Sequence, residues 1–531
     1  MTIKHPLWLF LLALATSWVV IGIAGFDGLY GQDSFHYLAC SRRILATPDA
    51  ALRPGSCYWP LGYPLLEALF ILLSGAAPLG AQLASTVTAA ALAPLVYWLA
   101  LESTVTVNNR QVRERIAIAA GLLMALCGQR LLSSIVVMSD APALFWGTLA
   151  ACALLRWARA EQRGLSRWLV GCAVTLAIAA ITRWIYAGLL VPFGVFASVT
   201  LYRWPTATSG SVAGVPVTPV RRIVAGVMPS LLLPAAIFLL IFLPQLYLSQ
   251  HSESPALSHG WLVGWNPLNA VRTSFDNPDG HFDYRFPPFI TYAMPLFHPF
   301  YLAPLLTPFV FLGAWQLRRS TVLLLLGGWI VTLYGYLAGV PSENSRFPLA
   351  FFPPVAVLAS LGLWRFAAGW RSLFARGTRD RPGADGDTFA RHAGRTFWLL
   401  LTAALIVAAP FTYRNVASLL SAKAREVSAL RYLQAHTPPD AVIVTFGLSA
   451  TLMEYSRAEV IDLFAQTPAT LRPVVCSARP VYLYVETGNI ESQWTGKSPA
   501  INVHWLQEAI GLETGGDHDT WTLYRVRRCS L

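Results

Sequence analysis

Long apolar runs separated by short polar segments occupy the chain up to about residue 412. A membrane-spanning helix needs about 20 mostly apolar residues. The first run, 6–26, follows Lys4 and His5 and lacks a small-residue cleavage site, so we interpret it as a retained signal anchor with a cytoplasmic amino end. The pattern predicts an α-helical polytopic membrane protein with about eleven transmembrane helices. The predicted spans are 6–26, 81–101, 116–134, 141–157, 168–184, 185–201, 222–247, 298–316, 320–340, 347–366 and 396–412.

The segment 61–75 is apolar but short, and it contains Glu67. If this segment crossed the membrane, the arginine cluster 110–115 would lie outside. Short cytoplasmic loops carry an excess of arginine and lysine, so we interpret 61–75 as an amphipathic helix along the outer interface. All strong arginine clusters then lie inside, and the carboxyl-terminal region lies outside.

The region after residue 412 alternates helical and strand-like segments. A helical segment near 418–436 precedes four short runs rich in β-branched and aromatic residues, which predict strands. We therefore expect a transmembrane core over 1–412, with a first outer loop at about 27–80, and an extracytoplasmic α/β domain over 413–531. The glycines at 511–516 predict a turn, and the arginine-, aspartate- and glycine-rich segment 377–394 predicts a disordered cytoplasmic loop. The strand-like runs are AVIVTFG, EVIDLF, VYLYVET and WTLYRV.

Composition excludes a soluble globular protein, because 12% of the residues are charged and 55% are hydrophobic. Soluble domains have about 25% charged residues. The net charge of +12 comes mostly from arginines in short loops, which is typical of topology control. A nucleic-acid-binding protein would instead gather its basic residues on one soluble face, so we expect no nucleic-acid partner.

Four of the seven cysteines lie in polar regions. If both regions face an oxidising compartment, Cys40 with Cys57 and Cys476 with Cys529 are candidate disulfides. Four free thiols are the alternative, since spacing alone does not establish pairing.

The first outer loop places Asp33 just after the first span, followed by His36, Tyr37, Arg42 and Arg43. An acid at the outer membrane surface can act as the general base for a hydroxyl acceptor. The alternative is structural, because an aspartate before the helical segment SFHYLACSRRIL also caps a helix.

Asp140 lies in the sequence VVMSDAPALFW between two apolar spans, where ionisable residues are costly and usually functional. An amino-terminal cap is again the structural alternative, with Ala-Pro beginning the next helix. A second carboxylate near Asp33 could bind a divalent cation or orient a substrate, although two acids without histidines are a weak metal signal.

Arginines on the same face are candidates for a phosphate site, since a guanidinium suits phosphate geometry. Arg183 lies in AAITRWIY and Arg346 lies in PSENSRFPLAFFP. For Arg346 the structural alternative is an ion pair with Glu343 that ties two helices together. Arg130 is a weaker candidate, because an arginine near the interface can extend toward water.

The order of these motifs resembles the GT-C class of polytopic glycosyltransferases, which includes protein O-mannosyltransferases and lipid A aminoarabinose transferases. The similarity covers most of residues 1–366 in order, and an external α/β domain also occurs in bacterial members. Two departures stand out. Ser34 follows Asp33 where protein O-mannosyltransferases often carry a second acid, and the first outer loop has no lysine, so Arg42, Arg43 or Arg53 would have to replace one. The motifs are YGQDSFHY, YWPLGYPLLEALFILLSG, MSDAP, ITR and ENSRFPLAFFPP.

This resemblance implies inverting transfer of a hexose or pentose from a polyprenyl-phosphate donor to a glycan, lipid or protein of the cell envelope. It places the reaction on the outer face of the plasma (inner) membrane. Asp33 would be the catalytic base, and Asp140 would be the second acid, which in some members contacts substrate or a divalent cation such as Mg²⁺ or Mn²⁺. The residues expected to bind substrate or phosphate are His36, Tyr37, Arg42, Arg43, Arg183, Glu343 and Arg346.

Two other functions stay open from the sequence. A polytopic transporter or flippase of a lipid-linked or envelope substrate would line its pathway with ionisable residues, but those should be distributed through the midplane rather than gathered on one face. An envelope assembly protein without chemistry is supported only by the tail domain.

Overall fold

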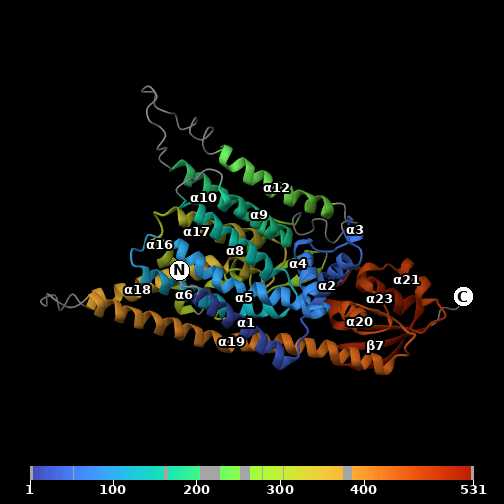
Figure 1. Ribbon diagram of the computed structural model, residues 1–531. Coiled ribbons are helices and arrows are strands. Elements are labelled where there is room, and N and C mark those ends of the chain that lie inside the picture. The colour runs from blue at the N-terminus through green and yellow to red at the C-terminus, as the bar shows by residue number, and fades with distance from the viewer. Residues whose placement is uncertain are drawn as a thin grey trace.

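The computed structural model describes residues 4–51, 53–160, 166–203, 228–250, 264–277, 279–302, 304–374 and 386–527. A bundle of helices forms the larger part, and a small domain with a β-sheet lies at one end of it (Figure 1). The first half of the bundle consists of α1 (Lys4–Ala24), α4 (Gly62–Ser74), α5 (Ala77–Ser103), α6 (Arg110–Ala125), α7 (Gly128–Ile135), α8 (Asp140–Trp157), α9 (Arg167–Thr182) and α10 (Leu190–Tyr202). The second half consists of α12 (Met228–Gln250), α16 (Thr307–Gln316), α17 (Thr321–Gly339), α18 (Phe352–Phe374) and α19 (Gly386–His436).

Short elements connect these helices or lie at the end that faces the tail domain. They are α2 (Gly31–Ala46) and α3 (Pro48–Ala51), the 3₁₀ helices η1 (Trp184–Leu189), η3 (Pro267–Val271), η4 (Pro304–Leu306) and η5 (Phe347–Phe351), the hairpin of β1 (Ser274–Asn277) and β2 (Gly280–Asp283), and the helices α14 (Pro288–Thr291) and α15 (Met294–Phe297).

Helix α5 lies at the centre of the bundle and packs against α1, α4, α6, α7 and α8. Alanines make this possible, because small side chains let helix backbones approach closely inside a membrane. Ala89, Ala93 and Ala100 are fully buried. Helices α16 and α18 approach each other even more closely, because Gly362 of α18 has no Cβ. A Cβ at this position would lie 1.8 Å from the carbonyl oxygen of Phe309 in α16.

Seven helices among the described residues are long and apolar enough to cross a membrane, or eight if the pair α6–α7, bent by 52°, counts as one span. A polytopic α-helical protein is therefore confirmed, but the count of eleven spans is not. In the predicted span 298–316 the α-helix α16 has ten residues and follows the short 3₁₀ helix η4, and α9 has 16 residues. Helix α4 has 13 residues, which is short for a span and agrees with the interpretation of 61–75.

Helix α19 is continuous over 51 residues, a length of about 75 Å. It runs along one side of the bundle and on into the tail domain (Figure 1). The span 396–412 and the helix 418–436 were predicted as separate segments, and this was wrong, because Pro410 interrupts the sequence pattern without ending the helix. The predicted boundary at 412/413 thus lies within α19. Part of the predicted disordered loop 377–394 is also helical, from Gly386 on, while 375–385 lie outside the described residues.

The tail domain contains a five-stranded sheet in the order β4-β3-β5-β7-β6, in which β3 is parallel to β4 and β5, and β7 is antiparallel to β5 and β6. The α/β prediction is confirmed. The predicted turn at 511–516 was wrong, because β6 crosses it with an irregularity between Thr514 and Gly516. The strands are β3 (Val442–Thr445), β4 (Glu459–Asp462), β5 (Val481–Val485), β6 (Leu512–His518) and β7 (Trp521–Val526). The helices are α20 (Ser449–Tyr455), η7 (Leu463–Ala465), α21 (Pro468–Val475), α22 (Thr487–Gln493), α23 (Ser498–Trp505) and the π-helical turn η8 (Leu506–Ile510).

A disulfide joins Cys40 of α2 to Cys57 in the first outer loop, with the two Cα atoms 5.4 Å apart. This confirms the first predicted pairing. Cys529 lies outside the described residues, so its pairing with Cys476 stays a prediction. The remaining three, Cys127, Cys152 and Cys172, are buried free thiols in the bundle.

Candidate functional site

Four of the predicted site residues meet where helices end on the side of the bundle that faces the tail domain. Asp33 is the third residue of α2, and Asp140 is the first residue of α8. Arg183 lies between α9 and η1, and Arg346 directly precedes η5. The structure therefore gathers two carboxylates and two guanidinium groups from four separate parts of the chain.

The two arginines pair with the two carboxylates. Nη2 of Arg346 lies 2.6 Å from Oδ2 of Asp33, and Nη1 of Arg183 lies 2.9 Å from Oδ1 of Asp140. Arg346 also approaches the second acid, since its Nε is 3.9 Å from Oδ2 of Asp140. Neither of these last two atoms has a hydrogen-bond partner among the described residues. The pairs thus leave a donor and an acceptor unused inside the cluster.

The two carboxylates differ in access to solvent. The side chain of Asp33 is 24% exposed, whereas that of Asp140 is 6% exposed. Asp33 is not the amino-terminal cap of α2, because Tyr30 occupies that position and its N–H bonds to Ser34 Oγ at 2.8 Å. The capping interpretation of Asp33 was therefore wrong. Asp33 is the accessible acid of the pair.

An aromatic ring and a thioether hold the arginines in place. The ring of Phe347 lies 4.7 Å from the guanidinium carbon of Arg183 and 5.5 Å from that of Arg346. Nη1 of Arg346 also lies 2.9 Å from the sulfur of Met138. Cation–π contacts of this kind stabilise a guanidinium without neutralising its charge. Met138 and Phe347 were not predicted as site residues, although each is a sequence neighbour of one that was.

Tyr37 supports the site from the protein interior and does not line its surface. Tyr37 is buried, and its hydroxyl lies 2.8 Å from Ser139 Oγ, which is also 3.4 Å from Nη1 of Arg183. The rings of Tyr37 and Tyr63 meet in a T-shaped arrangement with centroids 4.8 Å apart, and the hydroxyl of Tyr63 is 2.5 Å from Ser85 Oγ. Ser85 in turn accepts a hydrogen bond from the backbone N–H of Met138. These contacts fix the turn that carries Asp140.

Glu67 lies at the end of this buried network. It is fully buried in α4, and one carboxyl oxygen accepts a hydrogen bond from Ser41. The other oxygen has no hydrogen-bond partner among the described residues. Burial raises the pKa of Glu67 from 4.5 to about 8, although the hydrogen bond from Ser41 and the nearby Tyr63 hydroxyl act in the opposite direction. The carboxyl is therefore mostly neutral at pH 7.

We expect Glu67→Gln to flatten the pH dependence of stability. A raised pKa in the folded protein gives stability that is fully present below pH 4.5 and is lost as the pH rises through about 8. Glutamine is neutral at every pH, so the melting temperature of the variant in detergent should fall less than that of the wild type between pH 5 and pH 9. Glu513→Gln, on the exposed edge of the tail domain, is the control and should keep the wild-type slope. An unchanged slope for Glu67→Gln would contradict the assignment.

His36 lies on the rim of the cluster and stacks on Tyr58, with ring centroids 4.9 Å apart. Burial lowers the pKa of His36, although Asp33 and Asp462 act in the opposite direction, so the imidazole is neutral at pH 7. Burial and the nearby carboxylates of Asp279 and Asp33 raise the pKa of Tyr58 to about 12. The rim is thus aromatic and uncharged next to an accessible carboxylate.

A groove lies beside the site. It lies between the first outer loop, Trp184 at the start of η1, and Gln245, Leu248 and Ser249 near the end of α12. Tyr58 and Trp59 line the opposite wall. The four residues of the cluster do not line the groove, and Trp184, which directly follows Arg183, is its nearest connection to them along the chain.

Three predicted site residues have other partners. Both terminal nitrogens of Arg42 bond to Glu454 of the tail domain, at 2.7 and 2.8 Å, and Arg43 donates to the carbonyl of Ser56. Glu343 accepts a hydrogen bond from Thr291 at 2.8 Å. The alternative ion pair between Glu343 and Arg346 was therefore wrong, because Arg346 turns toward Asp33.

Arg130 does not extend toward water. It is fully buried in α7 and donates to the carbonyls of Ala13 and Ala125 and to the hydroxyls of Thr16 and Ser17. The interfacial interpretation was wrong, and Arg130 instead ties α1 to the bend between α6 and α7.

The cluster does not fit a divalent cation held by protein ligands. Among the described residues, no group of three or more His, Cys, Asp or Glu side chains could hold a metal ion. The guanidinium of Arg346 reaches both Asp33 and Asp140 and so supplies positive charge where a cation would bind.

Residues 72–248 match the family model of dolichyl-phosphate-mannose-protein mannosyltransferase. This region includes Asp140 and Arg183. No curated protein sequence matches the chain.

Solved structures share the fold at low sequence identity. ArnT from Cupriavidus metallidurans bound to undecaprenyl phosphate has a TM-score of 0.58 and 15% identity, with 97% of each chain covered. The Archaeoglobus fulgidus oligosaccharyltransferase tethered to an acceptor peptide has a TM-score of 0.52 and 14% identity, with 91% of this chain and 69% of that chain covered. The same archaeal enzyme in complex with zinc and sulfate has a TM-score of 0.50 and 13% identity, over 98% of this chain and 73% of that one. The shared fold confirms the expected GT-C-like architecture, and the family match over residues 72–248 agrees with the resemblance to polytopic glycosyltransferases.

Proposed function

We propose that the protein transfers a sugar, with inversion, from a polyprenyl-phosphate donor to a hydroxyl group of a cell-envelope glycan, lipid or protein. The reaction takes place on the outer face of the plasma membrane, with the amino terminus in the cytoplasm. The observation that carries the proposal is the cluster of Asp33, Asp140, Arg183 and Arg346 at the helix ends. It offers one accessible carboxylate and two arginines at a surface that a membrane lipid can reach.

In the proposed reaction the carboxylate of Asp33 takes the proton of the acceptor hydroxyl. The acceptor oxygen attacks the anomeric carbon on the face opposite the phosphate, and the bond between that carbon and the phosphate oxygen breaks. The polyprenyl phosphate leaves with the bonding electrons. Arg183 and Arg346 stabilise the charge that develops on it, which is how positioned cationic groups lower the barrier of such a step.

The ion pair between Arg346 and Asp33 gives the donor a role in activating the base. Arg346 neutralises Asp33 at a distance of 2.6 Å and has an unused Nε–H. A donor phosphate competes for that guanidinium, since arginine binds phosphate through two parallel hydrogen bonds. Drawn toward the phosphate, Arg346 would release the carboxylate of Asp33 for the acceptor. Donor binding would therefore precede deprotonation of the acceptor.

The groove beside Trp184 supports a lipid donor. One wall is formed by the end of α12, whose outer side carries exposed leucines such as Leu240 and Leu243. A polyprenyl chain can lie along such an apolar helix while its phosphate reaches Arg183. ArnT from Cupriavidus metallidurans binds undecaprenyl phosphate, so we use this lipid as the donor carrier in the test.

The test is sugar transfer by the purified protein in liposomes. Undecaprenyl phosphate carrying a radiolabelled hexose or pentose is supplied together with glycan, lipid or protein fractions of the envelope. We expect label to enter one fraction and undecaprenyl phosphate to be released in equal amount. The alternative of a flippase predicts instead that the intact donor crosses the bilayer without cleavage. Donor that moves but stays whole would refute the proposed reaction.

A further inference from the structure

We infer that the tail domain positions the catalytic loop through a clamp of five residues, an inference that rests on the proposed function. Asp27 and Arg42 lie at the two ends of the segment that contains Asp33, and Lys423, Glu454 and Tyr455 hold them from α19 and α20. None of the five contacts the Asp33–Arg346 cluster in the described residues. They are positioning residues rather than catalytic ones.

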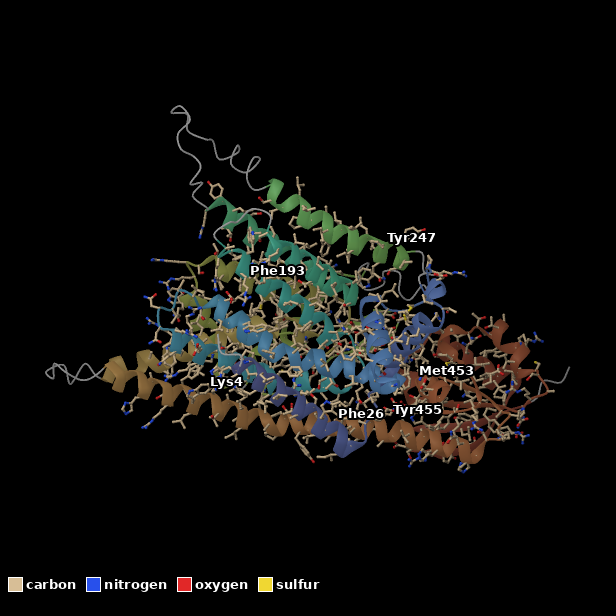
Figure 2. All side chains as sticks on the ribbon, viewed as in Figure 1. Lys4, Phe26, Phe193, Tyr247, Met453 and Tyr455 are labelled. Carbon is tan, nitrogen blue, oxygen red and sulfur yellow. A yellow bond between two sulfur atoms is a disulfide. The ribbon has the colours of Figure 1, made fainter. Side chains whose placement is uncertain are left out.

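The first half of the clamp is centred on Lys423, one of three lysines in the chain. Its Nζ donates to the carbonyl of Leu29 at 2.7 Å and lies 3.6 Å from Oδ1 of Asp27. Tyr455 donates its hydroxyl to the other oxygen of Asp27 and lies 3.3 Å from the same Nζ. Lys423 is buried, and a buried ammonium is stable only when it is paired and hydrogen-bonded. Figure 2 labels Tyr455 and Phe26, the residue before Asp27, in the region where the bundle adjoins the tail domain.

The second half of the clamp is the pair of Arg42 with Glu454. The guanidinium and the carboxylate share two hydrogen bonds of 2.7 and 2.8 Å, a geometry that fixes orientation as well as distance. Between the two halves, the ring of Phe35 meets Tyr455 edge to face at 6.1 Å. Helix α2 is therefore attached to α20 along its length.

The link before α2 explains why a clamp is needed. Gly25, Gly28 and Gly31 all have positive φ, between 58° and 86°. Glycine adopts such conformations freely and adds little stiffness to the link. Groups outside the link therefore hold it, with Gln82 and Val137 of the bundle donating to the carbonyls of Phe26 and Gly28. Asp27 and Leu29, the residues that Lys423 holds, lie within the same link. The clamp thus restricts the part of the chain that sets where Asp33 lies.

The consequence for catalysis follows from geometry. A general base must lie within hydrogen-bond reach of its proton, and a displacement of about 1 Å can cost about a hundredfold in rate. Loss of the clamp should lower kcat, because Asp33 is misplaced. The donor KM should change little, because Arg183, Arg346 and the α12 wall of the groove lie on other elements. A merely structural role would instead lower the amount of folded protein and leave kcat per folded molecule unchanged.

A charge exchange tests the clamp. Arg42→Glu and Glu454→Arg should each lower kcat about tenfold or more, with donor KM within about twofold of the wild type. The double exchange Arg42→Glu/Glu454→Arg should recover most of the loss, since opposite charges face each other again. Glu513→Arg, which breaks the exposed pair of Glu513 with Arg527 in the same domain, is the matched control and should leave kcat unchanged. Tyr455→Phe, which keeps the ring and removes the bond to Asp27, should lower kcat severalfold.

Hydrogen exchange of residues 27–46 separates this inference from the proposed function. We expect faster exchange in both single variants and wild-type exchange in the double exchange, whether or not sugar is transferred. If the double exchange does not restore protection, the clamp is refuted. If protection changes as expected but both single variants keep wild-type kcat, the positioning role is refuted. A wild-type protein that transfers no sugar refutes the proposed function alone.

Discussion

Asp33→Asn is expected to lower sugar transfer by about a hundredfold to ten-thousandfold, while the protein reaches the membrane in near-normal amount. Asparagine keeps the size of aspartate and its place in the first turn of α2, but its amide cannot take up the acceptor proton. The ion pair with Arg346 is also lost, but Arg346 is not left without a carboxylate, because its Nε lies 3.9 Å from Oδ2 of Asp140. The measurement is the initial rate of transfer from undecaprenyl-phosphate sugar in liposomes, normalised to folded protein.

Two controls accompany this variant. Asp33→Glu keeps the charge and should retain part of the activity, because a carboxylate remains within reach of the acceptor. Added Mg²⁺ or Mn²⁺ should relieve neither Asp33→Asn nor Asp140→Asn, since Arg346 already supplies the positive charge between these side chains. Relief by a cation would contradict our view of the cluster. Wild-type transfer by Asp33→Asn would remove Asp33 from the role of base.

Arg346→Ala is expected to raise the donor KM about tenfold to a hundredfold. The estimate follows from the loss of a charge-assisted contact worth about 1.5–3 kcal/mol, where each 1.4 kcal/mol is a factor of ten in affinity. Arg346→Lys should recover only part of the loss, because an ammonium cannot form two parallel hydrogen bonds to one phosphate. The measurement is donor KM together with inhibition by free undecaprenyl phosphate, which should weaken in parallel.

The contrast with the clamp makes this prediction specific. Variants of Arg42 should lower kcat, whereas variants of Arg346 should raise donor KM, although both remove an arginine from the same side of the bundle. A donor KM that stays at the wild-type value in Arg346→Ala would place the phosphate elsewhere. Disappearance of Arg346→Ala from the membrane would indicate a structural role for the ion pair with Asp33.

The sequence could predict which residues share a face but not which residues pair. Counting arginine clusters from loop to loop placed Asp33, Asp140, Arg183 and Arg346 on one side of the membrane, and the structure brings these four together. The partner of Arg346 could not be predicted in this way. Sequence proximity favoured Glu343, yet the guanidinium reaches a carboxylate 313 residues away, because several helix ends converge at that point.

Contacts between distant segments also explain the other differences. Arg42 was expected at the donor phosphate, but its partner Glu454 is 412 residues away and becomes a neighbour only when the tail domain folds back on α2. The glycines of β6 favoured a turn when the local sequence was considered alone. The segment is nevertheless a strand, because its backbone pairs with β7 and this pairing does not depend on the side chains of β6. The span count differed by three helices. Helices α9 and α16 are shorter than a bilayer requires, and α8 has 18 residues but carries Asp140 and Arg156 and does not qualify as an apolar span.

The continuity of α19 makes the tail domain sensitive to the exact number of residues in this helix. Each residue added to an α-helix turns everything beyond it by about 100° and moves it about 1.5 Å along the axis. One residue inserted between the bundle and Lys423 would therefore rotate α20 away from α2. Seven inserted residues would nearly restore the rotation but would shift the domain by about 10 Å. The rotation of the tail domain about the α19 axis and its position along that axis are thus set together, and no insertion in this stretch preserves both.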